Sequence, residues 1–203
     1  MTQFRPPYLF RWIFHRRIWG FSVREPFVYI TFDDGPTEEC TEWILSTLSD
    51  FDAKATFFCV GANAAAHPEL MQQIQAHGHT LGNHTMHHER GTKTEKKTYF
   101  ESIHQTGELI DSKLFRPPYG RIPMKYTSEV RKEYDILMWT WLSYDYDQTV
   151  PIETILNSAQ SIKAGDIIVL HDNKKSFERL KVILPQLLEI IRAKNLGFKA
   201  ISS

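Results

Sequence analysis

Short apolar runs rich in β-branched and aromatic residues alternate with longer amphipathic stretches along most of the chain. This alternation favours strands separated by helices, and therefore a parallel sheet built from right-handed β–α–β units. The expected strands are 27–32, 55–60, 80–83, 114–116, 136–142, 166–171 and a short one near 198–201. The expected helices are 38–48, 62–76, 93–111, 125–133, 152–162 and 176–194. About seven such units predict one α/β domain, a distorted or incomplete (β/α) barrel rather than an open sheet.

Polar side chains occur where these strands end, and active sites of (β/α) barrels lie at the carboxyl ends of the strands. They are Asp33 and Asp34 after the first strand, His84 after the third, Arg116 after the fourth, Asp145 after the fifth and His171 at the end of the sixth. We therefore expect these residues to share one rim of the sheet.

The pair Asp33-Asp34 lies in the segment Thr-Phe-Asp-Asp-Gly-Pro, residues 31–36. Two adjacent carboxylates destabilise each other unless a cation or a hydrogen-bond donor compensates. A metal ion bound by one carboxylate would leave the other available as a base. The alternative is a solvated turn, because Asp, Gly and Pro all favour turns.

His84 and His88 are four residues apart. That spacing places both imidazoles on one side of a helical turn, as in two-histidine metal sites, and directs His87 away. A carboxylate from another strand end would complete a facial triad. A histidine pair with a purely structural role is the alternative.

Two further segments offer catalytic side chains. Arg116 begins a rigid Pro-rich loop that ends at Gly120, and it can form a bidentate pair with a carboxylate. His171 ends an apolar strand and could act as a general acid, with Asp145 to orient its ring. The alternative for the Arg116 loop is a Pro-rich turn with a purely structural role. The alternative for His171 is a structural histidine whose hydrogen bonds are all made within the fold.

The first 26 residues differ from the rest, because aromatic residues interleave with arginines. We expect an N-terminal extension, residues 1–26, that packs its aromatics on a domain of residues 27–203. The alternative is an interfacial anchor that brings the chain to the cell envelope. No cleavable signal and no apolar run near the ~20 residues of a membrane span are visible, so the expected compartment is the cytoplasm. A formal net charge of zero gives no indication of nucleic-acid binding, and the oligomeric state stays open.

Taken together, these segments resemble the polysaccharide deacetylases, the NodB-homology domains of carbohydrate esterase family 4. The resemblance covers roughly residue 27 to the C-terminus and rests on five motifs in family order. They are the segment 31–36, the His-Thr-x-x-His pattern at 84–88, Arg-x-Pro-Tyr at 116–119, an aspartate segment around Asp145, and Leu-His at 170–171.

The resemblance implies a role for each matching position. Asp34, His84 and His88 would hold one divalent metal ion, with zinc the default and cobalt, nickel, iron or manganese also suited to the ligands. Asp33 would be the base, Arg116 its positioning partner, and His171 the acid oriented by Asp145. The backbone amide of Tyr119, beside Pro118, would help to hold the oxyanion, and Leu170 would line the acetyl pocket.

The fourth motif departs from the family's frequent Asp-x-x-Asp-Trp, because Leu142 and Tyr146 replace its first Asp and its Trp. The implied function is metal-dependent removal of N-acetyl, or O-acetyl, groups from an amino-sugar polymer or oligosaccharide such as peptidoglycan or a chitin-like glycan. One alternative is an amidohydrolase of the same fold that acts on a small non-sugar amide. The other is a catalytically silent glycan-binding domain.

Overall fold

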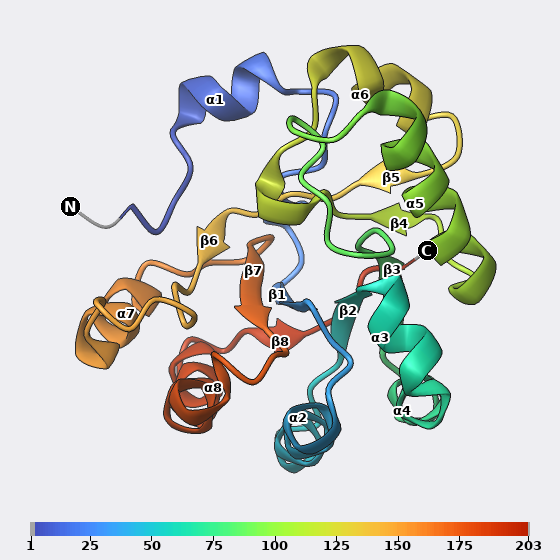
Figure 1. The fold of residues 1–203 in the computed structure, drawn as a ribbon. Coiled ribbons are helices and arrows are strands. Elements are labelled where there is room, and N and C mark those ends of the chain that lie inside the picture. Colours follow the sequence, from blue (N-terminus) through green and yellow to red (C-terminus); the bar gives the residue numbers. More distant parts are fainter. Residues whose placement is uncertain (1–2, 203) are drawn as a thin grey trace.

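The computed structural model describes residues 3–202, and a curled parallel sheet forms its centre (Figure 1). The strands are β1 (Phe27–Asp33), β2 (Ala55–Cys59), β3 (Thr80–Asn83), β4 (Leu114–Phe115), β5 (Asp135–Ile136), β6 (Trp141–Leu142), β7 (Ile167–His171) and β8 (Gly197–Phe198). Seven follow the order β5-β4-β3-β2-β1-β7-β6, and β8 pairs with the start of β1. Every pairing between these strands is parallel, and the predicted incomplete (β/α) barrel is confirmed.

Helices cover the outside of the curled sheet (Figure 1). They are α2 (Glu38–Asp50), α3 (Gly61–Ala66), α4 (Pro68–Ala76), α5 (Lys96–Leu109), α6 (Met124–Val130), α7 (Ile152–Ala159) and α8 (Phe177–Arg192). Two further helical segments are α1 (Tyr8–Ile13) and the 3-10 turn η1 (Pro118–Gly120). None of the helices within 3–202 is both long and apolar enough to cross a bilayer.

The two faces of the central strands have different surroundings. In β1, Val28, Ile30 and Phe32 belong to the large core shared with α2 and α8, where they are almost completely buried. The alternate residues Thr31 and Asp33 point to the concave side, because successive side chains of a strand face opposite ways. The outer core therefore stabilises the sheet, and the concave face is free to carry polar groups.

Two predicted elements are divided in the structure. The expected strand 136–142 is two short strands, β5 beside β4 and β6 beside β7, because the chain crosses from one side of the sheet to the other between them. The expected helix 62–76 breaks at His67, whose φ of −131° is not helical. Pro68 follows His67, and a residue before proline is disfavoured in the α region.

The N-terminal segment crosses the open side of the barrel between β5 and β6. Ile18 forms hydrogen bonds with the residues on both sides of Leu137, and Gly20 bridges Asp166. Further along the same side, the Leu142 N–H donates to the Phe4 carbonyl at 2.9 Å. This segment thus fills the gap that seven strands leave, while α1 lies outside it (Figure 1).

Candidate active site

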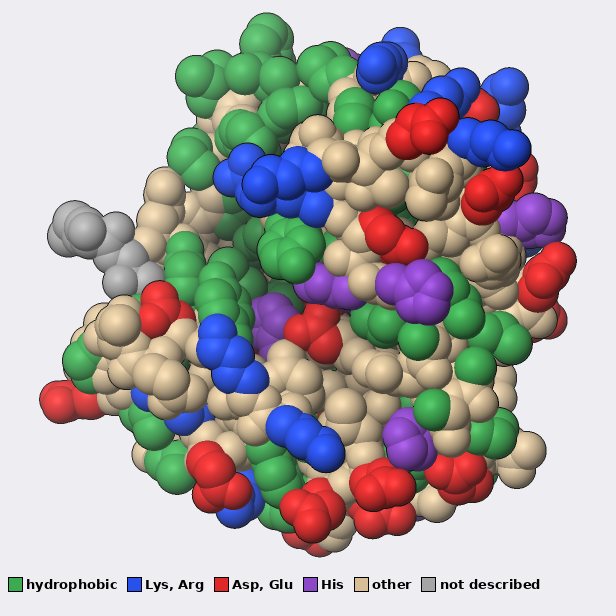
Figure 2. All heavy atoms as spheres, in the orientation of Figure 1, with side chains coloured by type: hydrophobic (Ala, Val, Ile, Leu, Met, Phe, Trp, Pro, Cys, Tyr) green, Lys and Arg blue, Asp and Glu red, His purple; other side chains and the backbone are tan. Residues whose placement is uncertain are grey.

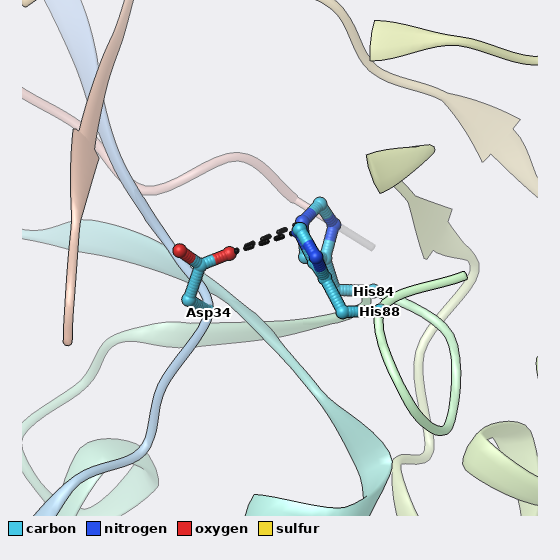
Figure 3. Close-up of side chains that lie close together, drawn as sticks. All are labelled: Asp34, His84 and His88. Atoms are coloured by element: carbon cyan, nitrogen blue, oxygen red, sulfur yellow. Dashed lines mark ion pairs between the residues drawn. The ribbon is translucent and has the colours of Figure 1, made fainter. Parts of the chain in front are cut away.

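Asp34, His84 and His88 converge at the carboxyl ends of β1 and β3 (Figure 3). Asp34 Oδ1 lies 3.6 Å from His84 Nε2 and 3.2 Å from His88 Nε2. One ligand atom from each residue falls within 4.8 Å of the others. Two imidazole nitrogens and one carboxylate oxygen at this separation form a facial set of metal ligands.

The backbone reaches this arrangement through left-handed residues. Asp34 has φ 82°, Thr85 φ 66° and His88 φ 59°. The expectation that His84 and His88 lie on a helical turn is wrong, because residues 84–88 form an irregular loop. A β-branched Thr at positive φ costs conformational energy, and such strain is typical of functional sites.

Hydrogen bonds orient two of the three residues, His84 and Asp34. His84 Nδ1 lies 2.7 Å from the Arg116 carbonyl, so Nδ1 carries the proton and Nε2 keeps its lone pair for a ligand. Asn173 Nδ2 donates to Asp34 Oδ2 at 2.7 Å, which leaves Oδ1 for the histidines. These partners suit a divalent ion, because the Arg116 carbonyl fixes the tautomer of His84 and Asn173 fixes the orientation of the Asp34 carboxylate.

Electrostatics favour the ionisation states that a metal ion requires. Burial tends to raise the pKa of Asp34, but the hydrogen bond from His88 and the charges of nearby histidines outweigh it and hold that pKa well below its ordinary value. Burial lowers the pKa of His84, against the opposing charges of Asp33 and Asp34. A carboxylate and a neutral imidazole are the binding forms of these side chains.

Asp33 stands beside this set on the concave face. Arg116 Nη1 donates to Asp33 Oδ1 at 2.7 Å and to Thr31 Oγ1 at 2.6 Å. The other guanidinium nitrogens donate to the carbonyls of Leu137 and Met138. Arg116 has no exposed surface, so its position and that of the Asp33 carboxylate are fixed by packing.

His171 ends β7 directly opposite Asp33 in the strand register. Its Nδ1 lies 2.7 Å from Asp145 Oδ1, and its backbone N–H donates to Asp145 Oδ2 at 2.8 Å. Burial opposes charge on the ring, but the Asp145 carboxylate outweighs burial and raises the pKa of His171 to about 9. The ring is therefore a protonated imidazolium near neutral pH, in the state of a general acid.

Tyr119 lies at the rim of the site, where its ring packs against His88 at an interplanar angle of 58°, with 4.6 Å between centroids. It too has a left-handed backbone, with φ 58° in η1 beside the buried Pro118. The N–H groups of Gly120 and Arg121 donate to the carbonyls of Pro117 and Pro118, whereas the Tyr119 N–H donates to none of residues 3–202. That amide is therefore available as a hydrogen-bond donor.

Leu170 does not line the site. It is completely buried in the outer core shared with α2 and α8, because strand alternation turns it away from the side that His171 occupies. The residue of β7 on the same face as His171 is Val169. The burial of Leu170 in the outer core does not fit the expectation that it lines the acetyl pocket.

Several residues at the site gave no clear signal in the sequence. Besides Asn173, Asn63 Nδ2 donates to the Asp34 carbonyl at 2.7 Å. Asp172 is completely buried and accepts hydrogen bonds from Thr37 and Thr41, and burial raises its pKa to about 7. Asparagine and aspartate next to a strand end are common in ordinary turns, so only Asp172, which directly follows His171, could have been suspected.

The fold and site together define a class of hydrolase: an incomplete (β/α) barrel whose strand ends carry an Asp-His-His set that could hold a metal ion, beside a buried carboxylate and a charged imidazole. A family model described as "Polysaccharide deacetylase" matches residues 22–138. The chain belongs to the polysaccharide deacetylase family, carbohydrate esterase family 4, as its motifs predicted.

Known relatives agree with this membership. A peptidoglycan-N-acetylglucosamine deacetylase of Bacillus cereus is 29% identical over 192 residues, which are 91% of this chain and 90% of the relative. A chitooligosaccharide deacetylase of a Bradyrhizobium strain is 30% identical, over 85% of this chain and 80% of the relative. The crystal structure of the Bc1960 peptidoglycan N-acetylglucosamine deacetylase superposes with a TM-score of 0.82 at 28% identity, over 97% of this chain and 95% of the other.

Proposed function

We propose that this protein hydrolyses N-acetyl groups of an amino-sugar glycan, with one divalent metal ion, zinc by default, held by Asp34, His84 and His88. The proposal rests on one observation: three kinds of side-chain group lie together at the carboxyl ends of the strands. They are a set of metal-binding side chains, a buried carboxylate and a charged imidazole. Similarity to relatives named for peptidoglycan and chitooligosaccharide deacetylation supports the glycan class.

The residues divide the chemistry between them. A divalent ion at this site would polarise the acetyl carbonyl and lower the pKa of a water molecule. Asp33, fixed by Arg116, takes the proton from the water as it attacks the carbonyl carbon. The Tyr119 N–H helps to stabilise the oxygen that becomes negative, a contribution of about 3–4 kcal/mol for one such donor.

His171 completes the reaction. As the carbon–nitrogen bond breaks, its imidazolium donates a proton to the departing amine, and acetate leaves. Asp145 stabilises the positive charge of the ring before that transfer. The base and the acid lie on neighbouring strands, β1 and β7, in register with each other, so both can reach one substrate.

The rim of the site supports a glycan over a small amide. Tyr119 is 59% exposed beside His88, and Tyr146 packs edge-on against His171 at 4.9 Å between centroids. A cavity of about 390 Å³ adjoins Tyr119 and is lined by Trp139 and Phe10. Figure 2 shows an open hollow with His and acidic side chains at its centre. Open aromatic surfaces suit sugar rings, whereas a small amide would be enclosed.

The test is acetate release from a panel of substrates: peptidoglycan fragments, N-acetylated chito-oligomers, acetylated xylan and small acetamides and formamides. We expect turnover of the N-acetylated glycans and none above background with Asp33→Asn protein. Turnover confined to small amides would indicate the amidohydrolase alternative. No turnover by folded protein loaded with metal would indicate a silent glycan-binding domain.

A further inference from the structure

Helix α1 exposes an unusual amount of apolar surface. Ten large hydrophobic side chains are exposed among the described residues, and five of them lie in this six-residue helix. They are Tyr8, Leu9, Phe10, Trp12 and Ile13, which are between 43% and 80% exposed. Figure 2 shows a green hydrophobic cluster at the upper left, where Figure 1 places α1. Contiguous apolar surface of this kind on a folded domain marks an interaction site.

The segments on both sides of α1 are fixed to the domain. Before the helix, Arg5 forms an ion pair with Asp166 at 2.6 Å. After it, Arg17 Nη2 donates to the Ile122 carbonyl at 3.0 Å, and Arg16 Nη1 donates to Ser128 Oγ at 3.1 Å. The domain therefore holds the apolar helix in a defined place.

The apolar surface continues onto α6. Met124, at the start of that helix, is 65% exposed and lines a cavity of about 330 Å³ together with Ile13. The patch thus joins two elements that are more than 100 residues apart in the sequence. Below, "the α1 patch" means Tyr8, Leu9, Phe10, Trp12, Ile13 and Met124.

The charge around the α1 patch is mainly positive. Residues 1–24 contain five of the 24 basic residues of the chain and none of its 24 acidic residues. Arg11 lies within α1 and the exposed Arg16 follows it, while the exposed Arg121 and Lys125 flank Met124. A second copy of the chain docked through this face would bring these cations together, which disfavours a symmetric dimer.

We propose that the α1 patch docks on the surface of an anionic lipid bilayer. Trp and Tyr prefer the membrane–water interface, and leucine and isoleucine beside them gain from insertion among the acyl chains. Each Arg or Lys close to an anionic surface adds attraction that salt weakens. Aromatic, aliphatic and basic residues are all present here, on a helix too short to span a membrane.

Docking in this way would bring the catalytic rim toward the lipid. Phe10 of the α1 patch and Tyr119 of the rim line the same cavity of about 390 Å³. The membrane association itself does not depend on the proposed deacetylation, and each can be tested without the other.

The test is co-sedimentation of the full chain with vesicles of equal parts phosphatidylglycerol and phosphatidylcholine, compared with pure phosphatidylcholine. We expect binding to the anionic vesicles that weakens with salt. The double variant Leu9→Ser, Trp12→Ser should bind at least about tenfold more weakly, since two apolar side chains no longer insert. Val182→Ser, which removes an exposed apolar side chain of α8, is the matched control and should bind like wild type.

A second readout locates the contact. Brominated lipid should quench Trp12 fluorescence in wild type, and Trp12→Phe should bind nearly as well with that quenching lost. The proposal is overturned if the anionic vesicles do not sediment the protein, or if the double variant binds as tightly as wild type. It is also overturned if sedimentation equilibrium shows a dimer that the double variant abolishes, because a second copy would then cover the patch.

Discussion

Replacing Asp145 with Asn tests how the protein keeps its acid protonated. Burial opposes a charge on His171, yet the carboxylate 2.7 Å away raises its pKa from 6.5 to about 9. Without that negative charge, only the smaller effects of Asp34 and Asp33 still oppose burial, and we expect the pKa of His171 to return to about 6.5. At pH 8 the protonated fraction of His171 is then about 0.9 in wild type and about 0.03 in Asp145→Asn, so activity that needs the acid should fall about 30-fold. At pH 6 both proteins keep most of the ring protonated, and activity should fall less than about twofold.

The assay is kcat/KM for acetate release as a function of pH. A general acid works only when protonated, so activity is lost as the pH rises through its pKa. The descending limb should lie near pH 9 in wild type and near pH 6.5 in Asp145→Asn. Ser143→Ala is the control, because it removes a 2.7 Å hydrogen bond to Asp145 without changing the charge. If Asp145→Asn keeps the wild-type limb, His171 is not the acid.

Three further results are expected. Asp33→Asn should keep its bound metal in elemental analysis but lose about 10²–10⁴-fold in kcat, the usual contribution of a general base. Gly35→Ala should lower the free energy of unfolding in urea by about 1–3 kcal/mol, because a Cβ there would clash with the Asp172 carboxylate. His79 is buried and neutral with its pKa lowered to about 4 by burial, so it contributes stability above pH 6.5 that is lost as the pH falls toward 4. That loss should be about 3 kcal/mol in urea titrations of wild type and should be much smaller in His79→Gln.

Much of the site could be predicted because strand ends are visible in the sequence. Asp33, Arg116 and His171 each follow an apolar run, and parallel strands bring their carboxyl ends to one edge. The roles given to these residues stay predictions until variants are measured. The misplacement of Leu170 was avoidable, since the two-residue period that turns His171 inward also turns Val169 inward.

Other features could not be foreseen because they depend on tertiary context. Spacing alone suggested a helical turn for His84 and His88, but Thr85 adopts a left-handed backbone that its β-branched side chain disfavours. The hydrogen bond from Asn173 to Asp34 joins residues 139 positions apart. Likewise, the N-terminal aromatics were expected to pack on the domain. Phe4 and Trp19 do so, but Tyr8, Phe10 and Trp12 of α1 are exposed, which only the packed structure shows.

The central claim is that hydrolysis depends on a metal ion held by Asp34, His84 and His88. The most direct measurement is acetate release from an N-acetylated chito-oligomer by chelator-treated protein, titrated with Zn²⁺, for wild type and His84→Ala. Wild type should be inactive after chelation and should regain full activity at about one ion per chain, whereas His84→Ala should bind no stoichiometric ion and stay inactive. Full activity of the chelated wild type, or recovery of His84→Ala at one equivalent of zinc, would contradict the claim.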